Sequence, residues 1–273
     1  MSTLAVCSWS LRPHSPTELV KNVQSCGISA VQLALDPIRD GSWDESQTQQ
    51  LLRDAKITII SGMMGTVGED YSTLETIART GGIRPDTTWP ANLANARENA
   101  AIAQRLGLRL ITFHAGFLPH HRGDIERTRM LDRLRQIADV FGSCNVQVAF
   151  ETGQENADTL VDVMQELNHP NTGVNFDPAN MILYGMGEPV AALHKLATYV
   201  RQIHIKDAIP TSVAGTWGQE VAAGTGAVAW PQFFDLVKTS LNVNLAIERE
   251  AGDTRIADIQ AARELVARSL TLR

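Results

Sequence analysis

Short stretches in which apolar residues recur at every second position alternate along this chain with longer segments of helical character. A period of two is typical of a β-strand, whereas a helix repeats every 3.6 residues. The pattern predicts eight strands, at 4–10, 30–35, 57–62, 108–116, 146–151, 173–177, 201–206 and 244–248. The last four each end on a charged or imidazole side chain.

The segments between these strands have the polarity pattern and end signals of helices. We predict helices at 16–26, 44–55, 90–106, 124–141, 157–167, 189–197, 230–240 and 255–270, with a short one near 73–79. Ser15 and Gly27 have the chemistry of an N-cap and a stop for the first helix. Strands joined by helical crossovers must run parallel.

This alternation favours one α/β architecture, a closed (β/α)8 TIM barrel forming a single domain over residues 1–273. A doubly wound sheet fits less well, because no GxGxxG motif follows the first strand and no Pro/Gly linker divides the chain. Two long glycine-bearing loops, 65–89 and 210–229, interrupt the regular pattern. Long loops after barrel strands usually carry function, so we expect the second to close over a bound substrate.

Composition narrows the classes of function. The 273 residues carry a formal charge of −6 without a Lys/Arg-rich run, which disfavours nucleic acid as a partner. The three cysteines are scattered, so neither a thiolate zinc site nor a disulfide framework is indicated. No signal peptide or membrane span is evident in the sequence, and we expect a cytoplasmic protein.

The strand ends carry the candidate chemistry. Glu151, Asp177, His204 and Glu248 share the parity of small or polar residues, while the large apolar side chains have the opposite parity. In a barrel these four would point inward at the C-terminal mouth, where active sites of this fold lie. Taken singly, Asp177 could cap the helix at Pro178 and His204 could be a hydrogen-bonded core residue.

The four together predict a metal site. Buried carboxylates are costly unless paired or bound to a cation, and Lys206 and Arg249 are the nearby cations in the sequence. Three carboxylates and one imidazole suit a divalent ion such as Mn, Mg, Co or Zn.

Other residues near the predicted mouth are candidates for binding substrate, namely Trp9, His114, Asn180 and Lys206. The structural alternatives are core packing for Trp9 and a core position for His114. For Asn180 the alternative is a helix cap, and for Lys206 it is pairing with a ligand carboxylate. Asp207 is a candidate helix cap or partner of His204. We expect Gln154 and Glu155 to be solvated, Glu220 and Glu250 to be solvated or structural, and Trp217 to be packed or to form an apolar wall.

Several stretches resemble one known family. They are Phe150–Glu155 (FETGQE), Asn175–Asn180 (NFDPAN), Ile203–Asp207 (IHIKD), Gly224–Gly226 (GTG) with Trp230, and Ile247–Glu250 (IERE). The chain is similar in these stretches to the xylose isomerase-like TIM barrel superfamily of sugar phosphate isomerases and epimerases. The resemblance implies that Glu151, Asp177, His204 and Glu248 bind one divalent metal. Ketose epimerases of this superfamily often have a histidine where this chain has Asn180, and an arginine near Pro210 and Thr211.

The resemblance implies an isomerase or epimerase of a sugar, sugar phosphate or related hydroxy-carbonyl compound, acting through a metal-bound enediolate. Glu151 and Glu248 would be the catalytic acid–base residues. The expected partner is a small polyol or keto-sugar, and a homo-oligomer is compatible with the sequence. Three alternatives remain: a dehydratase of the dehydroshikimate or inosose type, a non-catalytic sugar-binding barrel, and a nuclease of the AP endonuclease type. The nuclease would need extra histidines and a basic face that this sequence lacks.

Overall fold

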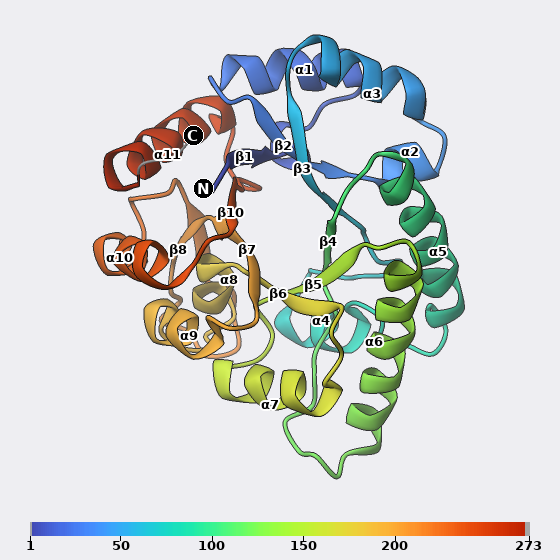
Figure 1. The fold of residues 1–273 in the computed structure, drawn as a ribbon. Helices are drawn as coiled ribbons and strands as arrows, with labels where there is room; N and C mark the ends of the chain where they lie inside the picture. The colour runs from blue at the N-terminus through green and yellow to red at the C-terminus, as the bar shows by residue number, and fades with distance from the viewer. Residues whose placement is uncertain (1, 271–273) are drawn as a thin grey trace.

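The computed structural model describes residues 2–270, in which eight parallel strands close into a barrel (Figure 1). Around the barrel the strand order is β1-β10-β7-β6-β5-β4-β3-β2. The strands are β1 (Leu4–Cys7), β2 (Ala30–Ala34), β3 (Thr58–Met63), β4 (Leu110–Phe113), β5 (Gln147–Glu151), β6 (Thr172–Phe176), β7 (Val200–Ile205) and β10 (Asn244–Ile247). The predicted TIM barrel is therefore confirmed.

A ring of helices surrounds the barrel in Figure 1. It consists of α1 (Pro16–Ser25), α3 (Glu45–Asp54), α5 (Trp89–Arg105), α6 (Ile125–Ser143), α7 (Ala157–Leu167), α9 (Pro189–Leu196), α10 (Trp230–Ser240) and α11 (Arg255–Ser269). Ser15 caps α1 as predicted, accepting a hydrogen bond from the backbone N–H of Glu18. None of the helices described is long and apolar enough to cross a membrane.

Short additional elements follow several strands on the mouth side of the barrel. They are η1 (Ser8–Leu11), α2 (Asp36–Arg39), α4 (Leu74–Thr80), α8 (Pro178–Leu183), β8 (Asp207–Ile209) and β9 (Gln219–Val221). Two predicted strands were therefore too long, because the chain after Cys7 turns into η1 and β4 ends at Phe113. The predicted loop 210–229 is also partly wrong, since β9 lies within it and pairs antiparallel with β8. Three-residue strands are too short for alternation to reveal them.

The core has the two faces that strand parity predicts. Outside the barrel, Phe113 packs edge-on against Phe150, and Phe176 packs against Phe233 of α10, with centroids 5.7 and 6.1 Å apart. A separate buried cluster of small residues fills part of the interior and comprises Ala5, Cys7, Ala30 and Ala246. Small and polar side chains thus line the axis, and large apolar ones face the helices.

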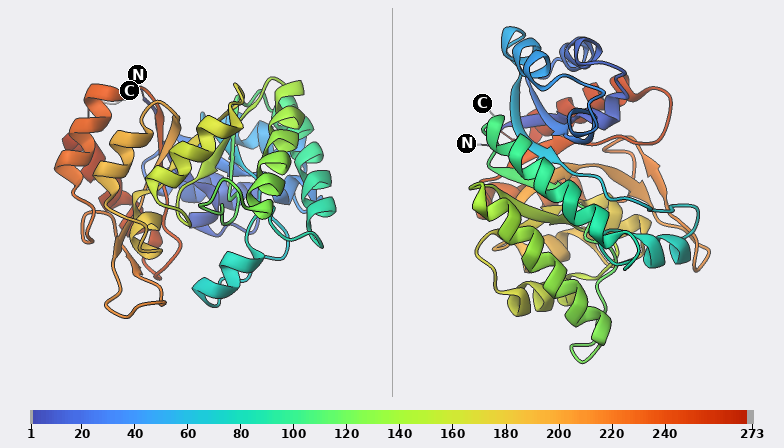
Figure 2. Two further views of the ribbon diagram at one scale, coloured as in Figure 1. Left: turned by 90° about the horizontal axis from the view of Figure 1, so that it is seen from below. Right: turned by 90° about the vertical axis from the view of Figure 1, so that its right-hand side faces the viewer.

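Both views in Figure 2 place α4 and the β8–β9 hairpin on one side of the barrel, where they project beyond the strand ends. The segment carrying α4 is fixed by backbone packing. Gly82 and Gly116 have φ of +64° and +90°, and a Cβ on either would collide with backbone atoms of the other loop. The backbone N–H of Ile83 donates to the carbonyl of Ala115 at 3.1 Å. Glycine is needed here both for its backbone angles and for this close approach.

Candidate functional site

Four side chains from neighbouring strands converge at the mouth. Glu151 ends β5, Asp177 follows β6, His204 lies on β7 and Glu248 follows β10. One donor atom from each lies within 4.8 Å of the others, and all four residues are buried. The Nδ1 atom of His204 is 3.6 Å from a carboxylate oxygen of both Glu151 and Asp177, and 3.3 Å from one of Glu248. The predicted ligand set therefore forms a compact cluster.

The two oxygens of Asp177 have different surroundings. Its Oδ1 accepts hydrogen bonds from the backbone N–H groups of Ala179 and Asn180, at 2.8 and 2.9 Å, which caps α8. Its Oδ2 is buried and has no hydrogen-bond partner among the described residues. Burial raises the pKa of Asp177 to about 6, although Lys206 opposes the shift. A buried acceptor without a donor, beside an imidazole nitrogen, is what a cation site needs.

The orientation of His204 is set from inside the barrel. Its Nε2 lies 2.9 Å from Oε1 of Gln32, an amide oxygen that can only accept, and its Nδ1 faces the three carboxylates of the cluster. Gln32 is held in turn by Thr112 and Gln202, and Gln202 also accepts from Ser61. A histidine whose Nε2 is held by a fixed carbonyl directs its Nδ1 at the cluster, which is the orientation that a metal ligand requires.

The two glutamates have different partners. Oε1 of Glu248 accepts from Nε1 of Trp9 at 2.6 Å, and Oε2 accepts from Nζ of Lys206 at 2.8 Å. Burial opposes ionisation of Glu248, but Lys206 and His204 outweigh it and hold its pKa well below the usual value.

Glu151 is bound by amides and an imidazole. Its Oε1 accepts from Asn180 at 3.0 Å, its Oε2 accepts from Asn175 at 3.2 Å, and Nε2 of His114 lies 3.5 Å away. Burial again opposes ionisation, but His204 and His114 lower its pKa. Both glutamates are therefore carboxylates at neutral pH and can accept a proton.

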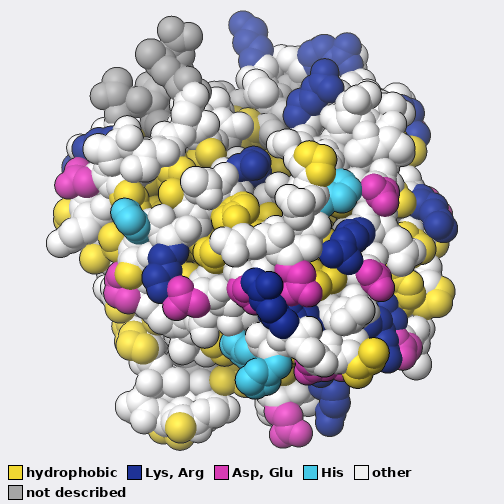
Figure 3. Space-filling model, turned by 60° about the horizontal axis from the view of Figure 1, so that its bottom comes forward, with side chains coloured by type: hydrophobic (Ala, Val, Ile, Leu, Met, Phe, Trp, Pro, Cys, Tyr) yellow, Lys and Arg dark blue, Asp and Glu magenta, His cyan; other side chains and the backbone are white. Residues whose placement is uncertain are grey.

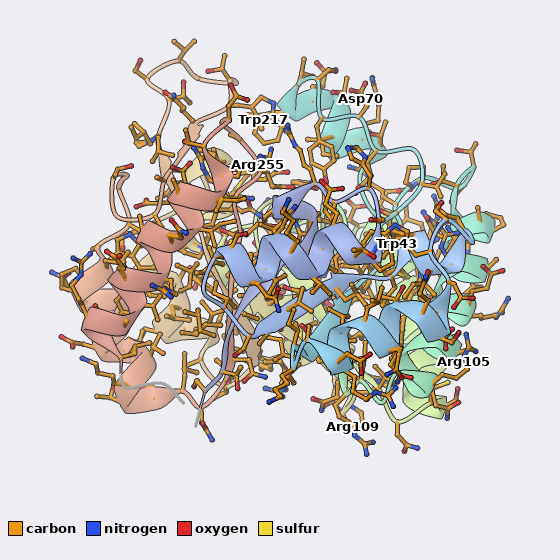
Figure 4. The ribbon with its side chains drawn as sticks, turned by 90° about the horizontal axis from the view of Figure 1, so that it is seen from above. Trp43, Asp70, Arg105, Arg109, Trp217 and Arg255 are labelled. Atoms are coloured by element: carbon orange, nitrogen blue, oxygen red, sulfur yellow. The ribbon has the colours of Figure 1, made fainter. Side chains whose placement is uncertain are left out.

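A cavity of about 410 Å³ opens beside this cluster. Three of the four candidate substrate-binding residues, His114, Asn180 and Lys206, line it. The fourth, Trp9, is not among the lining residues and packs 6.1 Å from the His204 ring while holding Glu248. Aromatic walls from Tyr71 and Tyr184, which the sequence did not single out, complete the cavity together with Trp217. Figure 4 shows Trp217 and Asp70 on the two projecting segments that flank the mouth.

Asp207 has neither of its predicted roles. Instead of capping a helix or supporting His204, its carboxylate accepts from the backbone N–H groups of Ala208, Gly224, Gly226 and Val228, and from Nε1 of Trp230. A Cβ on Gly226 would collide with this carboxylate. The Gly224–Gly226 motif and Trp230 therefore fix the base of the hairpin.

Gln154 and Glu155 were predicted to be solvated, and this was wrong. They are only 7% and 4% exposed, because α7 begins at Ala157 and the preceding turn is folded inward. Burial raises the pKa of Glu155 to about 8, with His114 opposing.

Glu220 is structural, whereas Glu250 is exposed and also paired, so both outcomes that the sequence offered occur. Glu220 accepts from Arg249 and from the backbone N–H groups of Glu250 and Ala251. Glu250 accepts from Lys206 at 2.7 Å.

The surface shown in Figure 3 intermixes Lys and Arg with Asp and Glu, and no single basic patch dominates that face. A phosphate backbone would need such a patch.

Comparison with known proteins defines the family. The model of the xylose isomerase-like TIM barrel family matches residues 20–269, and the chain belongs to this family. A solved xylose isomerase domain protein from Planctomyces limnophilus is 33% identical, with a TM-score of 0.84, covering 91% of this chain and 90% of that one. The comparison with curated proteins found no match.

Two further solved structures share the fold at lower identity. A probable 3-DHS dehydratase, AsbF, from Bacillus anthracis has a TM-score of 0.75 at 17% identity, covering 98% of this chain and 99% of that one. An L-ribulose 3-epimerase has a TM-score of 0.75 at 14% identity, covering 98% and 94%.

Proposed function

We propose that this protein is a divalent-metal-dependent isomerase or epimerase of a keto-sugar or related hydroxy-carbonyl compound. The observation that carries the proposal is a pair of buried carboxylates, Glu151 and Glu248, that share one compact cluster with Asp177 and His204. Their strands are separated by β6 and β7 in the barrel order, so the two groups approach the cluster from different directions. Membership of a family whose solved relatives include a sugar epimerase supports the reaction class.

Glu151, Asp177, His204 and Glu248 would hold one divalent ion, of the Mn, Mg, Co or Zn type. When bound, such an ion supplies positive charge that stabilises negative charge developing on adjacent carbonyl and hydroxyl oxygens of the substrate. The oxygen of Asp177 that lacks a hydrogen-bond partner among the described residues and the Nδ1 of His204, which faces the three carboxylates, fit this role.

The chemistry assigned to the protein's own residues is proton transfer at the carbon next to the carbonyl. One glutamate takes the proton from one face of that carbon. In an epimerase the other glutamate returns a proton to the opposite face, and in an isomerase a single glutamate moves it to the neighbouring carbon. Asn175 and Asn180 orient Glu151, and Lys206 and Trp9 orient Glu248. His114 and Asn180, which line the cavity, would bind substrate.

Metal content tests the ligand set. Purified protein should contain about one divalent ion per chain by mass-spectrometric metal analysis, and His204→Ala should lower metal affinity at least about tenfold. His194→Ala is the matched control, because His194 is an exposed histidine on α9. Unchanged metal content after replacing both His204 and Asp177 would refute the site.

Solvent exchange tests the reaction. Turnover of a keto-sugar in D₂O should place deuterium on the carbon next to the carbonyl, because the transferred proton passes through an exchangeable carboxyl group. Turnover without deuterium would indicate a hydride shift, and loss of water from the substrate would indicate a dehydratase. Binding of a sugar without any exchange would indicate a non-catalytic barrel.

A further inference from the structure

The cavity beside the metal-type cluster has a strongly acidic lining. Glu69 and Glu250 line it, and the carboxylates of Glu151, Asp177 and Glu248 lie at the adjoining cluster. A further lining residue, Glu220, is set aside here because its charge is matched by Arg249 at 2.8 Å.

Lys206 is the lysine among the residues that line the cavity, and its charge is already matched. Its Nζ lies 2.8 Å from Glu248 and 2.7 Å from Glu250. Without Glu220, the cavity and the cluster hold five carboxylates, and Lys206 supplies one positive charge against their five negative charges. Even a bound divalent ion and a protonated His114 would leave a negative excess.

The nearby arginines do not reverse this balance. Arg249 pairs with both Glu220 and Asp258, at 2.8 Å each. Arg12 and Arg255 line a separate recess with Gly252 and Asp253, and neither lines the cavity beside the cluster. A phosphate or carboxylate group placed in the cavity would thus meet like charge at close range, in a partly desolvated setting where repulsion is stronger than in water.

The same cavity offers groups that suit hydroxyls. Nε1 of Trp217 and Oγ1 of Thr66 are buried and have no hydrogen-bond partner among the described residues, although both residues line the cavity. Buried polar atoms are nearly always paired in folded proteins, so these two are suited to a ligand. Trp217 also packs against Tyr184 and Tyr71, with ring centroids 4.8 and 6.5 Å apart, which gives the cavity an aromatic wall.

We infer that the substrate is a neutral, polyhydroxylated carbonyl compound, without a phosphate or carboxylate group. This inference rests on the proposed function and narrows it. Glu69 and Glu250 exclude anions, Thr66 and Trp217 bind substrate hydroxyls, and the aromatic wall packs on the carbon skeleton. On this inference, sugar phosphates and dehydroshikimate-type acids are not substrates of this protein.

The test of the inference is to measure, by calorimetry, how tightly the metal-loaded protein binds neutral compounds and their anionic counterparts. The probes are neutral keto-sugars of four to seven carbons and cyclic polyol ketones, each compared with its phosphate ester, and dehydroshikimate as a carboxylate. The best neutral compound should bind at least about tenfold more tightly than its anionic counterpart, and the ratio should shrink at high salt. An anionic compound that binds as well as or better than the best neutral one, or a panel in which no neutral compound binds, would overturn the inference.

Deuterium exchange on the same samples separates this inference from the proposed function. Binding of a neutral compound without exchange would count against the isomerase or epimerase alone. Exchange on a phosphate ester but not on its neutral counterpart would count against the neutral substrate alone.

Two sets of variants locate the effect. The Glu69→Gln, Glu250→Gln double variant keeps both hydrogen-bonding side chains but removes two charges, so discrimination against the phosphate ester should fall about tenfold or more. Glu75→Gln is the control, because Glu75 is an exposed glutamate on α4 outside the cavity.

Trp217→Phe retains an aromatic ring but removes the N–H, and should weaken binding of the neutral compound roughly two- to tenfold. An unchanged neutral-to-anionic ratio in the double variant, or unchanged neutral binding in Trp217→Phe, would show that these residues do not select the substrate.

Discussion

The two sides of the barrel mouth hold the same kind of group in different ways. On the β10 side, Glu248 is bound by the ammonium of Lys206 and the indole of Trp9. On the β5 side, Glu151 is bound by the amides of Asn175 and Asn180, with His114 beside it. A full positive charge stabilises one carboxylate, and neutral donors with a titratable ring stabilise the other.

The difference indicates that the two glutamates are not interchangeable bases. The pKa of Glu248 is held well below its usual value, with Lys206 the main opposing influence to burial, whereas the pKa of Glu151 is lowered chiefly by the two histidines. Taking up a proton should therefore be less costly at Glu151. We expect Glu151 to be the more effective acceptor, and the predictions below test this asymmetry.

The largest effects should come from the glutamates themselves. Glu151→Gln and Glu248→Gln should each lower kcat by about 10²–10⁴-fold, because each removes a proton-transfer group. If the asymmetry holds, Glu248→Gln should retain some exchange of substrate hydrogen with D₂O, and Glu151→Gln should not. Metal content measured on the same samples separates lost catalysis from lost metal. Equal exchange in both variants would contradict the assignment.

Lys206→Met should act mainly on the Glu248 side, where Nζ makes its 2.8 Å contact with that carboxylate. It leaves a buried carboxylate without its counter-charge, so the metal-free protein should lose about 3–5 kcal/mol in the free energy of unfolding, measured by urea denaturation. A divalent ion should restore part of this loss because it supplies positive charge to Glu248. Lys195→Met is the control, since Lys195 forms a half-exposed pair with Asp158 and should cost about 1 kcal/mol or less. Similar losses in both variants would argue against the charged environment of Glu248.

The β5 side should show its own pH dependence through Glu155. Burial raises the pKa of Glu155 from its usual 4.5 to about 8. Between these values the unfolded chain loses the proton while the folded protein keeps it. The free energy of unfolding should therefore fall as pH rises from about 4.5 to 8, by up to roughly 1.4 kcal/mol per pH unit.

Glu155→Gln should flatten that slope, as followed by urea denaturation across the pH range. Glu264→Gln, at an exposed position on α11, should leave the slope unchanged. A slope in Glu155→Gln equal to that of the unmodified protein would show that Glu155 ionises normally in the fold.

Trp9→Phe should give the smallest effect. It removes one hydrogen bond to Glu248 but leaves Lys206 in place, so the loss in kcat/KM should be about tenfold or less. Asn180→Ala, which removes the 3.0 Å bond to Glu151 where no fixed charge compensates, should cost more. A larger loss in Trp9→Phe than in Asn180→Ala would reverse the proposed asymmetry.

Strand parity made much of the site predictable. A period of two sends Glu151, His204 and their neighbours to one face whatever the helices do, and the closed barrel brings their strand ends together. The same rule could have found Gln32 and Thr112, polar residues at positions that face the barrel interior. Three of the hydrogen bonds that hold Gln32, however, join residues 80 to 172 positions apart, and no local pattern identifies such pairs.

The predictions that failed depended on the loops. Glu155 lies in a turn whose inward path is set by tertiary packing, and polarity alone suggested solvent. Asp207 was assigned to the wrong role because its donors, such as Gly224 and Trp230, come from 17 and 23 residues later. Tyr71 and Tyr184 meet Trp217 through loops that pack only in the folded chain.

The five N–H groups that donate to Asp207 fix the base of the hairpin. Its tip is held separately, by Trp217 packed on Tyr184 and by the hydrogen bond from Gly218 to Leu183. Residues 210–217 lie between β8 and β9, beyond the base of the hairpin. This segment can therefore be replaced without changing the residues that bind Asp207. Replacing the tip between Ile209 and Gln219 would remove Trp217 from the cavity wall and so change which compounds the cavity accepts. Laboratory evolution of new specificities could begin there, with Asp207, Gly226 and Trp230 kept constant.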